Sequence, residues 1–479
     1  MDTLSDDVLI AIFNSYLGEY LPRVLGKERE RAWRSLVHVC RRWRSIVFGS
    51  PLHLDLELVC DGGTRAKDTL DVWPAFPLVI DCSMIYSKID AGNIIAVLER
   101  RDRVRRIHID NLMQYQRPIM GIILPAMQQP FPELTHLLLY TDEGTMPIVP
   151  ESFLGGSAPR LEYLELHRIP IQGLPKLLLS ATHLRTLYLE NVPHSGYISP
   201  DAMVAVLSTM TSLESLRLAF QSPRSCPDLT SRPPPPSTRS VLPVLTKFWF
   251  KGVSEYLEDF VDLIDTPQLN RSLITFFNDV VFETPRFIQF ITRTPTLIAL
   301  EKAHITFSDE RANVNFLSRT SQPTAMDIKL NVEIICRGLD WQLSFVEQVC
   351  TSCFTSLSMA EDLYIYRMRF SGQERRGKIE NEHWVELLHP FTGVKKLCLS
   401  GGFARHIGPA LQELVEGRTT EVLPTLENIY LEGLEPSGSV EEGIGQFVAA
   451  RQVAGHPMTI SHWANKWKET IDPIYRDEY

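Results

Sequence analysis

A short phrase with leucine-like residues at its first, fourth and sixth positions recurs along this chain. Clear copies begin at Leu161, Leu184, Leu213, Val394 and Leu426, and weaker copies begin at Val104, Leu134, Leu245 and Leu297. The starts at 104, 134, 161, 184, 213 and 245 are 30, 27, 23, 29 and 32 residues apart. A phrase that keeps its phase at such a period predicts a solenoid, in which each unit packs only on its neighbours.

Each copy predicts one short strand, and a helix follows in segments such as residues 200–210. Side chains alternate along a strand, so the fourth and sixth positions of the phrase would face the core, while the third, fifth and seventh point to the other face. Strands lie about 4.8 Å apart and helices need more room, so a stack of such units curves. The predicted fold class is therefore α/β, with a parallel concave sheet and outer helices.

This repeat resembles the leucine-rich-repeat horseshoe in its irregular form, and we expect it to span residues 52–462. Segments 326–335 and 360–368 are interpreted as degenerate copies. Residues 222–243 hold seven prolines and lack apolar periodicity, which predicts a loop insertion. Residues 463–479 are expected to form a C-terminal cap or tail.

Residues 1–51 follow a helical pattern instead. Ser5, followed by two aspartates, is typical of a helix start, because Ser caps free amides and acids favour the positive end of the helix dipole. Apolar stripes at spacings of three and four begin at Val8 and Trp33 and continue to Val47, which predicts two or three short helices. So small a unit cannot bury all of its apolar side chains by itself. One interpretation is a helical cap that covers the first turn of the following domain.

The order of residues in this region also resembles the F-box, the three-helix motif that docks on the Skp adaptor of Skp/cullin/F-box ubiquitin ligases. The matching residues include Val39-Cys40-Arg41-Arg42-Trp43-Arg44 and Pro51-Leu52. Ser5 stands where the family usually has Pro, and residues 18–32 form a longer connection than is usual. The resemblance implies that one set of residues is shared between the core of the motif and its adaptor face: Leu4, Val8, Leu9, Ile12, Phe13, Leu17, Val39, Cys40 and Trp43.

Charge and cysteine content narrow the class of partner. The net charge is -10, from 48 Lys and Arg against 58 Asp and Glu, which disfavours a nucleic-acid binder that relies on attraction to phosphates. Eight scattered cysteines do not indicate a disulfide framework in a chain of 479 residues. The acidic start differs from a secretory signal, and no apolar run approaches the length that spans a membrane. We therefore expect protein partners, no membrane, and a cytoplasmic or nuclear location.

Motifs with catalytic spacing are incomplete. Gly372 to Lys378 has the spacing of a phosphate-binding loop, but Ile379 stands where that loop needs a hydroxyl for magnesium. Cys350 and Cys353 form a lone CxxC pair without the second pair of a zinc site. His383 and His389 are six residues apart, which puts them on different faces of a helix. The sequence therefore predicts no catalytic residue, no metal and no cofactor.

The outward positions of the predicted strands are the candidate binding surface. They carry aromatic residues and arginine, the side chains that protein interfaces enrich, although aromatic residues also simply suit strands. The predicted target-binding residues are Tyr163, His167, Tyr188, Arg217 and Trp249.

The resemblance implies a non-catalytic, substrate-recognition subunit of a Skp/cullin/F-box ubiquitin ligase. Its first 51 residues would dock the Skp adaptor, and through it a cullin, while the repeat domain captures a target protein. The alternative is a leucine-rich-repeat interaction scaffold without ligase association, and an enzyme of the nucleotide-hydrolase class is a third reading of the sequence.

Overall fold

The structure is a computed structural model of the 479-residue chain. It describes residues 4–18, 27–51, 53–61, 66–82, 90–111, 119–141, 148–171, 173–223, 238–277, 284–298, 301–318, 328–353, 357, 359–367, 381–415, 418–432 and 439–463. The chain divides into two compact units, residues 1–221 and 222–479. Residues 372–379, which include the incomplete phosphate-loop motif, and the tail from residue 464 onwards lie outside the described residues.

Three helices occupy the start of the first unit: α1 (Asp6–Gly18), α2 (Lys27–Val39) and α3 (Arg41–Gly49). The hydroxyl of Ser5 accepts a hydrogen bond from the amide of Val8 at 3.4 Å, as a capping serine should. Phe13 is fully buried and packs on Trp43, with ring centroids 4.7 Å apart. The indole N–H of Trp33 donates to the carbonyl of Glu57 at 3.2 Å, which ties α2 to the chain just before the first strand.

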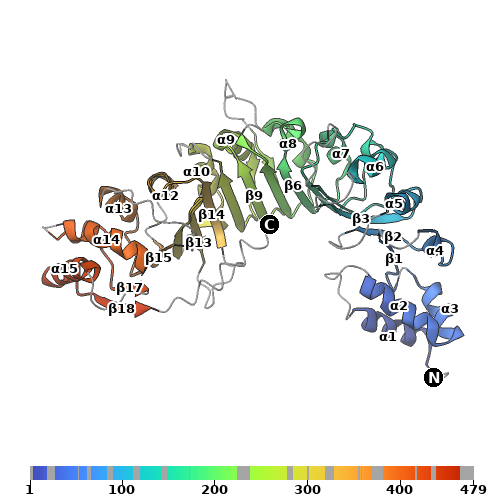
Figure 1. Ribbon diagram of the computed structural model, residues 1–479, viewed down its shortest axis with the longest axis horizontal. Helices are drawn as coiled ribbons and strands as arrows, with labels where there is room; N and C mark the ends of the chain where they lie inside the picture. The colour runs from blue at the N-terminus through green and yellow to red at the C-terminus, as the bar shows by residue number, and fades with distance from the viewer. Residues whose placement is uncertain are drawn as a thin grey trace. The chain divides into compact units, whose positions relative to one another are not determined.

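Seven parallel strands follow in chain order within the first unit (Figure 1). They are β1 (Leu58–Cys60), β2 (Leu78–Cys82), β3 (Val104–Asn111), β4 (His136–Thr141), β5 (Tyr163–His167), β6 (Thr186–Val192) and β7 (Ser215–Phe220). The connections carry α4 (Ala66–Leu70), α5 (Ala91–Leu98), α6 (Ile119–Ile123), α7 (Leu174–Ser180), α8 (Pro200–Leu207) and the 3-10 turns η1 (Leu124–Met127), η2 (Phe153–Gly156) and η3 (His194–Gly196).

The predicted phase of the repeat is confirmed in these strands. The fourth and sixth positions of the copies on β5 and β6 are at most 2% exposed, at Leu164, Leu166, Leu187 and Leu189. The residues that precede successive strands are also joined in a regular ladder, in which the amide of Arg185 donates to the carbonyl of Glu162 at 2.8 Å. Parallel strands and outer helices in this repeating register form a solenoid like that of leucine-rich repeats.

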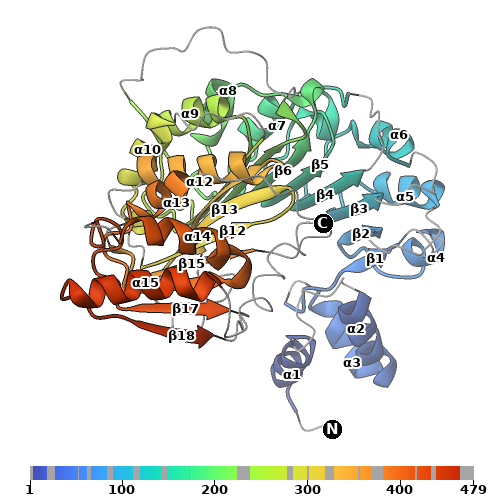
Figure 2. The same ribbon diagram turned by 60° about the vertical axis from the view of Figure 1, so that its left-hand side comes forward.

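The second unit has a sheet whose strand order departs from the chain order: β9-β11-β14-β13-β12-β15-β16-β17-β18. The strands are β9 (Lys247–Gly252), β11 (Arg271–Phe276), β12 (Lys302–Phe307), β13 (Arg311–Leu317), β14 (Ile328–Ile335), β15 (Asp362–Arg367), β16 (Lys396–Ser400), β17 (Asn428–Glu432) and β18 (Thr459–Trp463). The helices are α9 (Ser254–Asp262), α10 (Pro285–Thr292), α11 (Pro295–Ile298), α12 (Leu339–Cys353), α13 (Asn381–Leu388), α14 (Gly401–Glu413) and α15 (Ser439–Val453), and Figure 2 shows α12, α13 and α14 over one face of this sheet.

The prediction of a wholly parallel sheet is wrong at β13. This strand runs antiparallel to both β12 and β14, whereas the other pairs in the described sheet are parallel. The reason is the short connection from Phe307 to Arg311, where the amide of Ser308 donates to the carbonyl of Arg311 at 2.8 Å. A parallel pair needs a crossover connection of about a dozen residues or more. The short link between β12 and β13 can therefore only form a hairpin.

Two further sequence predictions need correction in this unit. The copy placed at Leu297 is out of phase, because the strand begins at Lys302 and its core-facing residues are Ala303 and Ile305. The repeat pattern did not predict strand β11, because Ser272 occupies a core-facing position where the phrase requires a leucine-like residue. Segments 326–335 and 360–368 do coincide with β14 and β15.

The predicted proline-rich loop is shorter than residues 222–243. Its central part, residues 224–237, lies outside the described residues. Beyond it, β8 (Ser240–Val241) pairs in parallel with β10 (Ile264–Asp265), and the guanidinium of Arg239 donates to the carbonyl of Asp262 at 2.9 Å. Leu242 is 1% exposed. The end of the predicted loop is therefore part of the second unit.

Within the described helices, none is both long and apolar enough to cross a bilayer.

These contacts predict different outcomes for two deletions. Replacing residues 224–237 with a short Gly-Ser linker should leave the melting temperature nearly unchanged, because loop length has a small entropic cost. A deletion of 224–240 should lower the unfolding free energy by about 1–3 kcal/mol, because it removes Arg239, which donates to the carbonyl of Asp262, and Ser240, whose amide donates to the carbonyl of Leu263. Urea denaturation of both variants measures the difference, and equal midpoints would contradict the role given to Arg239.

Candidate protein-interaction surfaces

The outward side chains of β4 to β7 form one surface, which we call the tyrosine face. It comprises Tyr140, Tyr163, Glu165, His167, Tyr188, Glu190 and Arg217. Four of the five predicted target-binding residues lie on it, on the adjacent strands β5, β6 and β7. Glu165 is 7% exposed and the other side chains are half-buried.

A continuous row of rings crosses this surface. The ring of His136 on β4 stacks on Tyr163 with centroids 5.9 Å apart, and Tyr163 meets Tyr188 edge-on at 5.9 Å. The guanidinium of Arg217 lies 5.0 Å from the ring centre of Tyr188. Such ring and cation contacts hold the side chains in place before any partner arrives.

A second row runs beside the first. The rings of Tyr140 and His167 stack with centroids 5.9 Å apart, and His108 lies 6.0 Å from Tyr140. The Nε2 atom of His167 lies 2.7 Å from the side-chain nitrogen of Asn191, so one hydrogen bond fixes the ring. His167 is thus both on the predicted surface and oriented by a neighbouring strand.

Each of the two carboxylates on the tyrosine face has a polar partner on the same face. The hydroxyl of Tyr163 donates to Glu165 at 2.5 Å, and the guanidinium of Arg217 contacts Glu190 at 2.5 Å. Burial, together with the charge of Glu165, raises the pKa of Tyr163 and of Tyr140 well above the ordinary value. Burial lowers the pKa of His136, and the nearby Arg106 adds to that effect. The exposed parts of this surface are therefore ring edges and faces rather than free charges.

The fifth predicted target-binding residue, Trp249, lies on β9 of the second unit. It is half-buried, and the guanidinium of Arg271 on β11 lies 5.9 Å from its ring centre. Its outward position agrees with the predicted phase.

A buried polar row on the second unit's sheet was missed by the sequence reading. The amide of Asn331 donates to Asn315 at 2.7 Å, and Asn315 donates to Asn313 at 2.8 Å. On the same face the ring of His304 packs 4.3 Å from that of Tyr364, and burial lowers the pKa of His304 to about 3. The reversed strand β13 brings Asn313 and Asn315 beside Asn331, so the spacing of the repeat carried no signal for this row.

The N-terminal helices carry a second kind of surface. Large apolar side chains at Leu4, Val8, Ile12 and Val39 are 40%, 44%, 47% and 55% exposed, and we call these four the N-terminal apolar patch. Val8 and Ile12 are four residues apart and so share one face of α1, and Leu4 lies just before that helix begins.

The remaining residues of the predicted adaptor set divide between core and surface. Leu9, Phe13 and Leu17 are buried, Trp43 is half-buried against Phe13, and Cys40 is exposed. Arg42 donates to the carbonyl of Leu4 and to the carboxylate of Asp6, which holds the start of α1 beside the junction of α2 and α3.

The remaining cysteine, histidine and arginine motifs lie in three different environments. Cys350 is fully buried on α12, and burial raises the pKa of its thiol, which disfavours a thiolate nucleophile. Within the described residues, potential metal ligands converge at Glu347, His383 and Glu386 on the outer helices α12 and α13. Residues 100–106 hold five arginines, and one of them, Arg106, pairs with the carboxylate of Glu57 and so stabilises the fold.

Comparison with known proteins yields little beyond this. No protein-family model matches the chain. No curated protein matches it either. Among solved structures it is similar to the crystal structure of the leucine-rich repeat-containing protein LegL7 from Legionella pneumophila, at 11% identity over 82% of this chain and 97% of that chain, with a TM-score of 0.26.

The raised pKa of Tyr163 predicts a pH dependence of stability. An unfolded phenol ionises near pH 10, whereas the folded one keeps its proton beyond that point, so its stabilising effect is complete below about pH 10 and is lost as the pH rises further. Wild-type protein should therefore lose unfolding free energy more steeply than Tyr163→Phe above about pH 10, by at most about 1.4 kcal/mol per pH unit. Urea titrations at pH 8 to 11 measure this, and parallel curves would exclude the effect.

Proposed function

We propose that this chain is the substrate-recognition subunit of a Skp/cullin/F-box ubiquitin ligase. The observation that carries the proposal is the N-terminal apolar patch, in which four large apolar side chains stay exposed while Leu9, Phe13 and Leu17 fill the core between the helices. Several exposed large apolar groups on so small a helical unit are typical of a protein-docking surface. They coincide with residues that the F-box resemblance assigns to the core and adaptor face.

The tyrosine face supports the other half of the proposal, the capture of a target protein. Tyrosine and arginine are enriched among the residues that dominate binding energy at protein interfaces. Here they are already oriented by the contacts of Tyr188 with Arg217 and of Arg217 with Glu190. Side chains fixed in advance lose less conformational freedom when a partner binds.

The proposed mechanism is proximity. The subunit has no catalytic residue of its own in this scheme, and ubiquitin transfer is performed by the other subunits and the conjugating enzyme. Holding a target near the charged conjugate raises the effective concentration of its lysines, which turns a rare encounter into an intramolecular one.

The alternative function is a leucine-rich-repeat interaction scaffold whose N-terminal helices only cap the solenoid. One observation favours it: Arg29 on α2 donates to the carbonyls of Leu17 at 3.3 Å and Leu54 at 3.1 Å, and Trp33 donates to that of Glu57. The bonds to Leu54 and Glu57 attach α2 to the chain just before the first strand, as a cap requires, and the bond to Leu17 joins α2 to α1. A cap, however, gains nothing from an exposed apolar patch.

We expect the double variant Ile12→Asp with Val39→Asp to lose co-purification with the Skp adaptor. Both side chains are about half exposed, so a charge there should leave the fold intact, whereas at an interface it would be buried without a partner, at a cost of several kcal/mol. Asn14→Asp, which adds one negative charge at another exposed position of α1, is the control and should retain the adaptor.

Adaptor recovery that is equal for the wild type and the double variant would contradict docking through this patch. Absence of adaptor from the wild type itself would leave the scaffold function in its place. Circular dichroism melting of the three proteins checks that the difference is not one of folding.

For target capture, we expect Tyr188→Ala and Arg217→Ala to keep adaptor binding and a cooperative melt but to lose targets that the wild type retains when the cullin is inhibited. Truncation of a central interface residue often costs about 2 kcal/mol or more. Leu187→Ala, at the neighbouring core-facing position, should instead lower the unfolding free energy by about 2–5 kcal/mol. Quantitative mass spectrometry of the captured proteins gives the readout, and unchanged capture by both surface variants would remove the tyrosine face from the proposal.

A further inference from the structure

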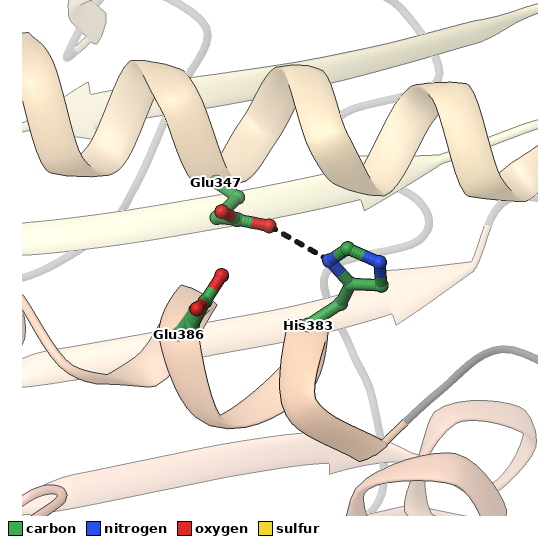
Figure 3. Close-up of side chains that lie close together, drawn as sticks. All are labelled: Glu347, His383 and Glu386. Carbon is green, nitrogen blue, oxygen red and sulfur yellow. Dashed lines mark hydrogen bonds and ion pairs between the residues drawn. The ribbon is translucent and has the colours of Figure 1, made fainter.

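Two outer helices of the second unit bring a histidine and two glutamates together (Figure 3). Glu347 comes from α12, while His383 and Glu386 come from α13, three residues apart and therefore on one side of that helix. The Nδ1 atom of His383 lies 3.2 Å from a carboxylate oxygen of Glu347. One ligand atom from each of the three residues can be chosen so that all lie within 4.8 Å of one another.

The charges of this cluster are not balanced by the protein. Glu347 is mostly enclosed, with its side chain 19% exposed, and the carboxylate of Glu386 points toward it. In the part of the chain that the structure describes, neither carboxylate forms an ion pair with lysine or arginine, and His383 is the only charged-pair partner of Glu347. Two carboxylates held this close repel each other when both are charged, and a cation bound between them removes that repulsion.

We propose that Glu347, His383 and Glu386 bind a zinc ion that joins α12 to α13. The donor set selects the metal: imidazole nitrogen with carboxylate oxygen suits Zn²⁺, whereas Ca²⁺ and Mg²⁺ take oxygen ligands. Tetrahedral zinc bonds of about 2.0–2.2 Å place ligand atoms about 3.4 Å apart, so the most distant of the three atoms must move closer by about 1 Å, and the exposed side chains of His383 and Glu386 have the freedom to do so. Three protein ligands leave a fourth position for water.

The position of the cluster indicates a structural role. The two helices belong to consecutive repeats within the second unit and pack against each other. Helix α12 also covers β12, β13 and β14. In such an array each unit is stabilised mainly by its neighbours, so a metal between two helices strengthens that junction. Bound zinc stabilises the folded state by mass action, because the ligands are not assembled in the unfolded chain. The cluster shares no residue with the tyrosine face or the N-terminal apolar patch, so this inference is independent of the proposed function.

The test is zinc binding to the full-length chain by isothermal titration calorimetry, after dialysis against EDTA and then metal-free buffer. We expect one zinc site whose affinity falls about tenfold or more in His383→Ala and in Glu347→Gln. The matched controls are His389→Ala, an exposed histidine just after α13, and Glu382→Gln, an exposed glutamate on α13, and both should bind zinc as the wild type does.

Thermal melting separates a built site from surface charge. Zinc should raise the melting temperature of the wild type and of both controls but not of the two cluster variants. In EDTA, Glu347→Gln should melt at or above the wild type because it removes the repulsion from Glu386, and the other three variants should melt like the wild type because their changed side chains are exposed. Equal zinc affinity in the wild type and the cluster variants would overturn the proposal. So would a shift of equal size with Ca²⁺, because it would show an acidic surface rather than a histidine-containing site.

Discussion

Core-facing side chains in register hold each repeat of the solenoid to the next, and the positions of the surface side chains depend on them. In the first unit Leu137, Leu164, Leu187 and Leu216 are paired in sequence across four strands, and each is fully buried. Side chains alternate along a strand, so placing these leucines inward forces their neighbours outward. Tyr163, Tyr188 and Arg217 therefore share one face because of where the leucines lie.

This dependence explains which parts of the fold the sequence could predict. Strands β5, β6 and β7 carry complete copies of the phrase, and their phase was predictable residue by residue. The alternation of inward and outward side chains is the same whichever way a strand runs, so it held no information on the reversal of β13. The direction of that strand is instead set by its short link to β12. Strand β11 was hidden for a simpler reason, the serine at position 272 in place of an apolar residue.

The candidate sites were predictable to a similar depth. The phase indicated which residues face outward, but not that Tyr163 meets Glu165, or that Arg217 lies between Tyr188 and Glu190. Such contacts depend on rotamers and on the register between strands. The cluster at Glu347 and His383 was beyond prediction, because its members are 36 residues apart on two helices. On α1, helical spacing alone could not say which side of the stripe would stay exposed, and packing on α2 and α3 decided it.

The two proposed binding surfaces rest on elements of different kinds, and this affects how each can change. Side chains on the tyrosine face contact mainly one another, and the leucines behind them stabilise the fold. Substitutions on that face can therefore change which partner binds while the core stays unchanged. The N-terminal apolar patch lacks such separation. Val8 and Ile12 alternate along α1 with Leu9 and Phe13, which fill the core between three short helices. A shift in the packing of that small core would move the patch with it, so docking at this end is coupled to the folding of α1, α2 and α3, whereas binding at the sheet is not.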